Sequence, residues 1–407
     1  KPLQTTSTTL VDLLSADPDY IQLLRLLQRT RLIPTLNKLN GSTLFAPTND
    51  AVQRHSVWTR FLAREDEEIQ ANDNINEQVR QTLLYHLLNY TLPTFPPAQN
   101  EVATYNTLHF PRIPVSPPSP NPPPAPPWVP LPGGSLHNES QRLRAAVRGD
   151  GDALDGSTKA YVDVDASGQN GTPVVKEPVS GTNCLLVGIN DVLEVPKSLA
   201  AIIKDTPELS YLVNVLPEAQ MQSLEKDPGL TVFLPEDDAW GVLHPVIRLY
   251  LESPFARGDL KWIVGMHVAD GKLGYSDRFG EATRIRTIEG NKLRVNASSP
   301  DGITVSGAAL RQRDVFASNG VLHTVSSLLL PPDSFTLNAE KYLLALNCSS
   351  FVGLLRSVNL TDLVTDQDAE YTILAPRDDV LDVIESTGHG GGSFPEKGTD
   401  ELKKSLR

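Results

Sequence analysis

Cysteine is scarce in this chain of 407 residues, which contains only Cys184 and Cys348. Two thiols do not make the disulfide framework of a small secreted domain, so stability has to come from packing. The two cysteines fall in different predicted domains. We therefore expect two buried or half-buried free thiols, with a bridge between domains as the alternative.

Long hydrophobic runs are also absent. No segment reaches the roughly 18 to 20 uncharged apolar residues that cross a bilayer, and the first ten residues, KPLQTTSTTL, form no hydrophobic signal segment. The sequence therefore predicts a chain without a membrane-spanning segment. Its net charge of −13 is spread along the chain, which argues against nucleic acid as a partner, because polyphosphate would be repelled at long range.

Catalytic and metal-binding motifs are missing as well. The sequence has no H-E-x-x-H, no C-x-x-C, no phosphate-binding glycine loop and no G-x-S-x-G elbow. HGGGS at 389–393 resembles an oxyanion loop, but without the elbow it indicates a flexible linker. DVDASGQNG, from Asp163, resembles the start of a calcium loop, but Val174 stands where a bidentate Glu is expected, which favours a polar turn. We predict no catalytic residue, metal site or cofactor.

One phrase occurs three times in the sequence. Its three versions are TLFAPTNDAV at 43–52, VFLPEDDAW at 232–240 and TILAPRDDVL at 372–381. Each version lies between two segments with helical spacing of apolar residues. The repetition predicts three copies of one folding unit.

Each phrase predicts a short apolar strand followed by a helix. The strands are expected at 43–46, 231–234 and 372–375. A proline ends each strand, because proline cannot donate to a sheet ladder; these are Pro47, Pro235 and Pro376. An aspartate follows where the helix begins, and we expect it to cap the helix and complement its dipole; these are Asp50, Asp238 and Asp379.

The order of these parts resembles the fasciclin (FAS1) domain, in the tandem arrangement of a fungal-type secreted protein. The parts are a helix, [FL]-[AL]-P-x-[ND]-D, a Tyr-His or Met-His segment, and NGVLH before a terminal strand. The resemblance implies an α+β fold in which each domain is a β-wedge or sandwich flanked by helices. It divides the chain into domains at 1–196, 197–332 and 333–407. The third domain is expected to be incomplete, with an open sheet edge and poor burial.

The first domain contains a proline-rich insert at about 111–139. Twelve of the 22 residues from Pro111 to Pro132 are proline, which predicts a polyproline-II-like or disordered segment. It separates TLHF from SQRLRAAV, two stretches that match the strands joined by a turn at Gly290 in the second domain. We expect the insert at a hairpin tip, either as a recognition site for an aromatic-lined groove or as a solvated spacer.

The resemblance also suggests positions for contact with a partner. Tyr85-His86 and Met266-His267 fall on the segment that the family associates with cell adhesion. The alternative is a half-buried pair that hydrogen-bonds a nearby loop. Asn319-Gly320 is predicted to form a turn and His323 to satisfy backbone groups. The first domain has NCLLVGIN in place of that histidine motif, so a shared catalytic histidine is not expected.

Two Arg-Gly-Asp triplets occur, at Arg148–Gly149–Asp150 and at 257–259. The first lies in the Gly- and Asp-rich stretch VRGDGDALDG and is the better candidate for partner binding, while the second is weaker. A triplet of this kind needs an exposed turn, which the sequence alone does not establish.

Sequons for N-glycosylation are more frequent than chance gives, which points to a secretory route. The seven asparagines are Asn40, Asn89, Asn138, Asn170, Asn296, Asn347 and Asn359.

The sequence as a whole favours a secreted or cell-surface protein that acts in adhesion or in matrix or cell-wall association. Its partners would be a cell-surface or matrix protein, a polysaccharide, or a copy of itself. The rival hypothesis is an enzyme or small-ligand carrier that uses an interdomain cleft lined by Tyr85, His86 or His267. A protein of a vacuolar lumen would share the same sequence features.

Overall fold

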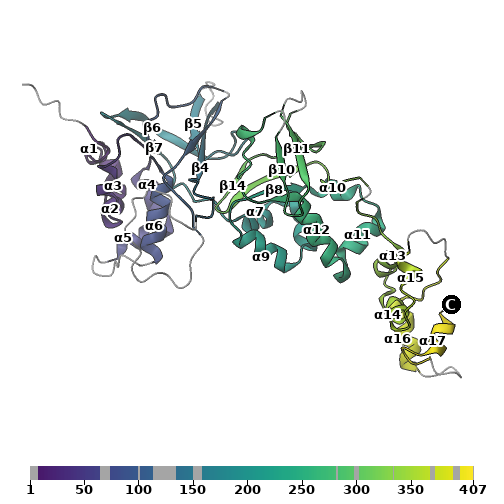
Figure 1. The fold of residues 1–407 in the computed structure, drawn as a ribbon. Coiled ribbons are helices and arrows are strands. Elements are labelled where there is room, and N and C mark those ends of the chain that lie inside the picture. Colours follow the sequence, from purple (N-terminus) through teal and green to yellow (C-terminus); the bar gives the residue numbers. More distant parts are fainter. Residues whose placement is uncertain are drawn as a thin grey trace, which may run out of the picture.

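The computed structural model describes residues 8–64, 74–99, 101–112, 134–149, 158–280, 283–297, 302–332, 334–366, 372–387 and 395–406. Figure 1 shows three successive units, coloured from purple to yellow along the sequence. We call them the first repeat (10–189), the second repeat (199–325) and the third repeat (339–405). Helices and sheets both occur, so the fold class is α+β, as predicted.

The first repeat packs helices against one seven-stranded sheet. Its helices are α1 Leu10–Ala16, α2 Ile21–Arg29, α3 Ile33–Leu36, α4 Asn49–Arg54, α5 Ser56–Ala63 and α6 Asn74–Tyr85. Its strands are β1 Ser42–Pro47, β2 Leu87–Leu88, β3 Val102–Asn106, β4 Arg142–Gly149, β5 Thr158–Val162, β6 Thr172–Ser180 and β7 Cys184–Ile189. The strand order is β2-β1-β7-β6-β5-β4-β3.

The proline-rich insert leaves from the hairpin formed by β3 and β4. Beyond the paired strands, Arg112 and Gly134 form an isolated antiparallel bridge. Residues 113–133 lie outside the described part of the chain. The strand predicted at TLHF is wrong, because β3 ends at Asn106. The ladder becomes irregular at Thr107, whose backbone N and Oγ1 both donate to the carbonyl of Gln141.

The second repeat contains two four-stranded sheets. Its helices are α7 Leu199–Asp205, α8 Ser210–Val215, α9 Glu218–Lys226, α10 Asp237–Gly241, α11 Pro245–Glu252 and α12 Arg257–His267. Its strands are β8 Leu230–Pro235, β9 Val268–Ala269, β10 Arg284–Arg286, β11 Lys292–Asn296, β12 Thr304–Val305, β13 Ala308–Ala309, β14 Val315–Ala317 and β15 Gly320–Val325. The sheet orders are β10-β11-β12-β13 and β14-β15-β8-β9.

The first two repeats share a buried parallel pair of strands. β1 pairs with β7 and β8 pairs with β15, and all six residues of each strand are buried. β1 ends at Pro47 and β8 at Pro235, as predicted. Because the same joint recurs beside the same final strand, the two units have equivalent cores.

The described part of the third repeat is helical. Its helices are α13 Ala339–Ala345, α14 Ser349–Ser357, α15 Asp362–Thr365, α16 Asp378–Thr387 and α17 Asp400–Ser405. The strand predicted at 372–375 is wrong, since 372–377 carry no strand assignment and Leu374 is 90% exposed. In the other repeats that strand pairs with β7 or β15, and no such partner is among the described residues here.

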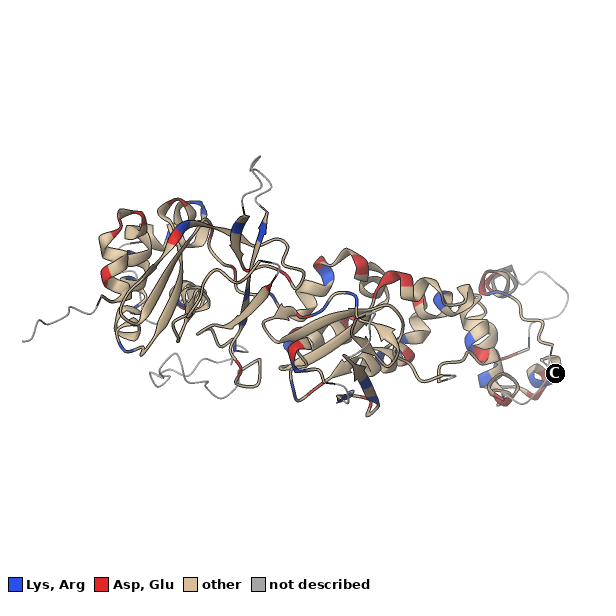
Figure 2. Ribbon diagram, turned by 90° about the horizontal axis from the view of Figure 1, so that it is seen from above, with Lys and Arg blue, Asp and Glu red and all other residues tan. Residues whose placement is uncertain are grey.

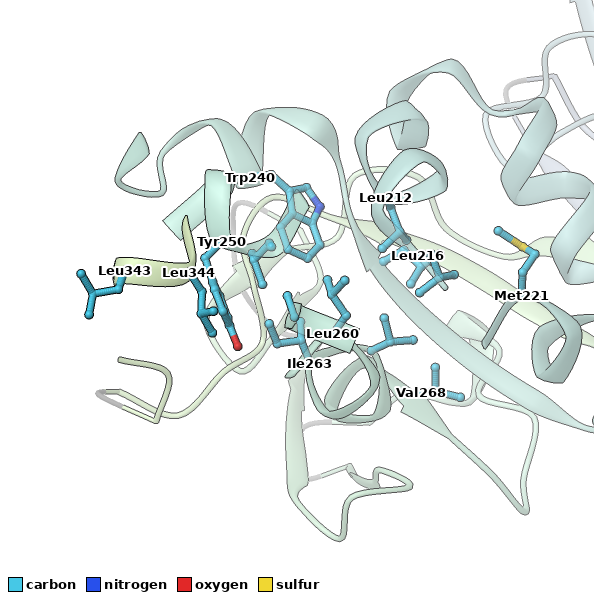
Figure 3. Close-up of a cluster of buried hydrophobic side chains, with 14 of the residues drawn as sticks. Leu212, Leu216, Met221, Trp240, Tyr250, Leu260, Ile263, Val268, Leu343 and Leu344 are labelled. Carbon is cyan, nitrogen blue, oxygen red and sulfur yellow. The ribbon is translucent and has the colours of Figure 1, made fainter. Parts of the chain in front are cut away.

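The third repeat shares its hydrophobic core with the second. Leu343 and Leu344 of α13 belong to the same buried cluster as Tyr250, Leu251 and Leu260 of the second repeat. Figure 3 shows Leu344 beside the Tyr250 ring. The helices of the third repeat therefore bury their apolar faces together with those of the second.

The prediction that Asp50, Asp238 and Asp379 cap helices needs correction. They lie in the first turns of α4, α10 and α16, but the N-cap of α4 is Thr48 and that of α10 is Glu236. Each helix begins one residue before the predicted aspartate, so these carboxylates project from the first turn. There they complement the helix dipole without occupying the N-cap position.

A different side chain of the repeated phrase makes the capping bond. Asn49, Asp237 and Asp378 each accept a hydrogen bond from a backbone N–H in the first turn of an earlier helix, α2, α8 or α14. The N···O distances are 3.0, 2.9 and 2.7 Å, respectively. In all three repeats the phrase thus ties the helix that it begins to the start of an earlier helix, and in the first two repeats it also ends the core strand.

Both cysteines are free and buried, as the sequence predicted. Burial raises the pKa of the Cys184 and Cys348 thiols, which keeps both protonated near neutral pH.

Candidate functional site

His86 joins the end of α6 to the segment that follows β7. Its Nδ1 donates to the carbonyl of Thr82 at 2.7 Å, and its Nε2 accepts from the backbone N–H of Leu193 at 2.9 Å. The side chain is completely buried, and its ring centroid lies 5.5 Å from that of Trp58. Both ring nitrogens are therefore used by the backbone, one as donor and one as acceptor.

Tyr85 is also completely buried, and its hydroxyl donates to Asp163 Oδ1 at 2.9 Å. Burial raises the pKa of Tyr85 well above its ordinary value, and the nearby Asp163 carboxylate adds to this effect. Burial also raises the pKa of Asp163 to about 6, against the opposing effects of the Tyr85 hydrogen bond and Arg144. This contact holds α6 against the turn that follows β5.

His267 makes the same two bonds in the second repeat. Its Nδ1 donates to the carbonyl of Ile263 at 2.7 Å, and its Nε2 accepts from the backbone N–H of Leu329 at 2.8 Å. Met266 occupies the place of the tyrosine and is buried. The histidine is thus the shared structural element, while the preceding residue differs between the repeats.

The prediction of direct partner contact by Tyr85, His86, Met266 and His267 is contradicted by their burial. The alternative, a half-buried pair that hydrogen-bonds a nearby loop, is nearer to the structure, because both histidines bond loop backbone, but all four side chains are at most 3% exposed. Burial lowers the pKa of both histidines to about 4, so they are neutral at pH 7. In this conformation they act as neutral cross-links between backbone segments.

The NGVLH motif also has a structural role, as predicted. His323 Nδ1 accepts from the backbone N–H of Asp314 at 3.1 Å, and its Nε2 donates to the carbonyl of Gly274 at 2.8 Å. Asn319 lies in the turn between β14 and β15, where its Oδ1 accepts from Leu199 N at 2.9 Å. A Cβ on Gly320 would come within 2.3 Å of the carbonyl oxygen of Leu230, so the close strand pairing requires glycine there.

The Arg-Gly-Asp triplets do not form exposed turns among the described residues. Arg148 stacks over the ring of Tyr161, with its Cζ 3.6 Å from the ring centroid, and donates to the carbonyl of Gly168. Gly149 ends β4, and Asp150 lies outside the described residues. The second triplet begins α12, where Asp259 accepts a hydrogen bond from the Tyr250 hydroxyl.

The stretch that resembles a calcium loop forms a polar turn, as predicted. Asp165 Oδ1 accepts hydrogen bonds from Ser167 and Gln169, and its Oδ2 accepts from Asn170. Within the described ranges, no group of three or more His, Cys, Asp or Glu side chains is placed to hold a metal ion. The HGGGS segment at 389–393 lies outside the described residues.

Arg142 is one of two β4 arginines that join the first repeat to the second, a contact that the sequence analysis did not anticipate. Its Cζ lies 3.6 Å from the centroid of the Tyr275 ring, and its Nη1 donates to Asp277 Oδ2 at 2.8 Å. The side chain is only 9% exposed. It therefore combines a ring contact with an ion pair whose acidic partner, Asp277, is 58% exposed.

Arg144 repeats this arrangement two residues further along β4. Its Cζ lies 3.8 Å from the centroid of the Phe316 ring, and its Nη2 donates to the carbonyl of Asp314 at 2.9 Å. The signal in the sequence is an arginine at alternate positions of an apolar strand, which places both on one face. That face was readable from SQRLRAAV, but the surface it meets was not.

The returning arm of the proline-rich insert also docks on the second repeat. Ser135 Oγ donates to the carbonyl of Ser318 at 2.5 Å, and the Ser135 carbonyl accepts from Gly229 N at 2.7 Å. Leu136 is fully buried in a cluster that includes Tyr275 and Val321. The base of the insert therefore forms part of the junction between the repeats.

A cleft of about 380 Å³ lies between the first two repeats. The turn at 165–167 lines one side, and residues 302–303 and 310–313 line the other. Tyr85, His86 and His267 do not contribute to its walls, so the predicted lining of an interdomain cleft is wrong. Those side chains lie inside the repeats, bonded to the backbone.

All seven sequon asparagines are exposed, namely Asn40, Asn89, Asn138, Asn170, Asn296, Asn347 and Asn359. Four of them, at 138, 170, 347 and 359, have φ between 56° and 68°, typical of a left-handed turn. Attachment of a glycan requires an accessible asparagine, and every predicted position meets that requirement.

Comparisons with known proteins agree with this fold. The family model described as the fasciclin domain matches residues 18–116 and 207–331. The chain is 24% identical over 205 residues to the fasciclin-like arabinogalactan protein CTB11 of Cercospora beticola, covering 50% of this chain and 53% of that protein. It is 30% identical over 132 residues to the transforming growth factor-beta-induced protein ig-h3 of Sus scrofa, covering 32% and 19%.

Among solved structures, a FAS1 domain pair from the insect cell adhesion molecule Fasciclin I is similar, with a TM-score of 0.33 and 18% identity. The match covers 75% of this chain and 95% of that one. Because the matched family segments make up more than half of the sequence, the chain belongs to the fasciclin domain family. It spans about half the length of CTB11 and about a fifth of ig-h3.

Proposed function

We propose that this protein is secreted or displayed at the cell surface, and that it acts in adhesion or in matrix or cell-wall association through protein or glycan contacts. Membership of the fasciclin family supports this proposal, and one relative is by name a fasciclin-like arabinogalactan protein. In the described part of the chain, no helix is long and apolar enough to span a bilayer.

The observation that carries the proposal is the exposure of all seven sequon asparagines. N-glycans are added in the secretory pathway, so usable sequons suit an extracellular or lumenal protein. The buried histidines also support a role without catalysis, because His86, His267 and His323 direct both ring nitrogens to backbone groups.

Two measurements test the proposal. The chain made in a eukaryotic secretory host should lose mass on endoglycosidase treatment, and a variant with all seven sequon asparagines changed to Gln should not. The immobilised wild-type protein should retain cells, matrix polymers or a second copy of itself. Retention of none of these would overturn the adhesion proposal, and an unglycosylated secreted product would overturn the glycoprotein part.

Localisation of the tagged chain separates the two compartments that share these features. We expect it at the cell surface, in the wall or in the medium. A signal confined to a vacuolar lumen would favour the alternative, in which the same fold works inside that compartment.

A further inference from the structure

Four cations occupy one face of the β10–β11 hairpin. The antiparallel register places Arg284 opposite Arg294 and Arg286 opposite Lys292. All four are exposed, whereas Leu293, between two of them, is buried on the other face. We call Arg284, Arg286, Lys292 and Arg294 the cationic hairpin face.

The cationic hairpin face has no acidic partner among the described residues, where no ion pair or side-chain hydrogen bond joins its members to a carboxylate. The one acidic residue of the described hairpin, Glu289, lies at the turn, where its carboxylate packs close to Gly265 of α12. By contrast, Arg142 and Arg144 on β4 stack on aromatic rings and bond acidic residues of the second repeat.

The arrangement does not serve the stability of the hairpin. Like charges directly opposite each other on neighbouring strands repel and destabilise the pair. A surface that needed only solubility would be served by mixed charges, as on the helices in Figure 2, where both acidic and basic positions occur. Residues 283–313 contain six Lys or Arg and only two Asp or Glu, in a chain with a net charge of −13.

We propose that the cationic hairpin face binds an acidic polysaccharide, a polymer that carries sulfate or carboxylate groups. The proposal rests on the proposed function, because it assigns a site and a ligand class to the matrix contact. Opposed side chains across the strands are about 5 Å apart, and positions i and i+2 along a strand are about 7 Å apart. The four charges thus form a flat, open rectangle that suits a linear chain of anions.

The face lacks the features that other polyanionic partners use. Proteins that bind single-stranded nucleic acid offer aromatic stacking platforms, and residues 283–313 contain no Phe, Tyr or Trp. Protein interfaces are anchored by buried aromatic and apolar side chains, which this face also lacks. Polar neighbours are present instead, because Asn296 pairs with Thr304 beside the cations.

Asn296 makes the test sharper, because it is both a sequon asparagine and a neighbour of Arg294 on the same side of β11. A glycan there would stand at the end of the cationic hairpin face. Asn296→Gln removes the sequon without removing a cation, so binding should be retained or tightened. Loss of binding in this variant would assign the contact to the glycan and overturn the proposal.

The experiment measures retention of the full chain on immobilised heparin, which carries sulfates, and on polygalacturonate, which carries carboxylates, with dextran as the neutral control. Wild-type protein should bind one or both acidic polymers and elute with increasing NaCl, because ionic contacts with a polyanion are weakened by salt. The variant with Arg284, Arg286, Lys292 and Arg294 all changed to Gln should lose affinity by about 10-fold or more.

A matched control removes four cations elsewhere. Arg25, Arg60, Lys226 and Lys261 are exposed on α2, α5, α9 and α12, and changing them to Gln alters the net charge equally. This control should bind like the wild type. Both variants should show a cooperative thermal transition if their folds are intact, and the hairpin variant is expected to gain stability from lost repulsion.

Equal binding by the hairpin variant and the wild type would overturn the proposal. Binding to phosphatidylserine vesicles but to neither polymer would also overturn it. Light scattering that showed self-association of the protein to be the cause of its retention on the polymers would do the same. A wild-type chain that retains cells or matrix protein but no acidic polysaccharide would refute this site and leave the proposed function intact.

Discussion

The guanidinium of Arg144 lies 3.8 Å from the centre of the Phe316 ring, and the two residues belong to different repeats. The same side chain is 7% exposed and donates to the carbonyl of Asp314 at 2.9 Å. Ring stacking and a charge-assisted hydrogen bond act from one buried group. They fix the orientation of the first repeat on the second.

Arg144→Ala is therefore expected to uncouple the two repeats. The free energy of unfolding should fall by about 2–4 kcal/mol, because the variant loses a desolvated ring contact and a charged hydrogen bond and opens a gap. Differential scanning calorimetry should show one transition for the two repeats in the wild type and two in the variant.

Arg148→Ala is the matched control for that change. Arg148 lies on β4, as Arg144 does, and its Cζ is 3.6 Å from the centroid of the Tyr161 ring. Both residues of this contact belong to the first repeat. We expect a smaller loss of stability and no splitting of the transition. Identical calorimetric traces for the Arg144 and Arg148 variants would show that the junction does not couple the repeats.

The buried histidines make stability depend on pH. The pKa of His267 is lowered to about 4 by burial, from an ordinary value of 6.5. Between these two values the unfolded chain binds a proton that the native state does not, so stability falls as the pH drops through this window. Above pH 6.5, neutral His267 therefore adds about 3 kcal/mol to the free energy of unfolding, relative to a pH below 4.

His267→Gln tests this dependence by urea unfolding at several pH values between 7 and 4.5. The variant should be less stable at pH 7 and should lose less stability on acidification than the wild type. In the first repeat, Asp163, with a pKa raised to about 6, binds a proton more readily when folded and opposes the effect of His86. If the free energy of unfolding fell equally with pH in the wild type and the variant, buried His267 would not be the source of the pH dependence.

Local chemistry explains which features could be predicted from the sequence. Pro47 and Pro235 end their strands because proline lacks an N–H, and His323 bonds the backbone because NGVLH enters a buried strand. The strand expected at 372–375 could not be judged locally, since a strand forms only beside a partner. Apolar pattern and a following proline were present, but not the pairing that they need.

Contacts between distant residues were out of reach for a related reason. Arg144 and Asp314 are 170 residues apart, and the residues around either one do not indicate which distant segment it contacts. The burial of Tyr85 and His86 likewise depends on Asp163 and Leu193, which approach only when the sheet is complete. The N-caps of α4 and α10 are Thr48 and Glu236, two positions before the predicted Asp50 and Asp238, because a pattern of polar residues does not fix the first residue of a helix.

Asn319→Ala should be among the most damaging single changes in the second repeat. The side chain is 4% exposed, accepts from Leu199 N at 2.9 Å, and donates to the carbonyls of Leu224 and Asp227 at 2.9 and 3.0 Å. Removing it leaves buried backbone groups without partners, so unfolding should become easier by about 2–4 kcal/mol in urea denaturation.

Asn183 offers a control at the equivalent turn of the first repeat. It is exposed and precedes β7 as Asn319 precedes β15. Asn183→Ala should change stability by less than about 0.5 kcal/mol, the range of ordinary surface substitutions. If both alanine variants behaved alike, the network around Asn319 would not be a source of stability.

The joint of the repeated phrase can be tested by comparing two neighbouring aspartates. Asp237 accepts hydrogen bonds from Ser210 Oγ at 2.5 Å and from Tyr211 N at 2.9 Å, whereas Asp238 lies in the first turn of α10. Asp237→Ala should cost about 1–2 kcal/mol, as for the loss of a helix cap, and Asp238→Ala about 0.5 kcal/mol or less, since it removes only an exposed dipole interaction. Chemical denaturation of the two single variants gives the comparison. A larger effect at position 238 would return the capping role to the residue that the sequence pattern first indicated. It would also show that the bond from α8 to the first residue of α10 is not what the three repeats share.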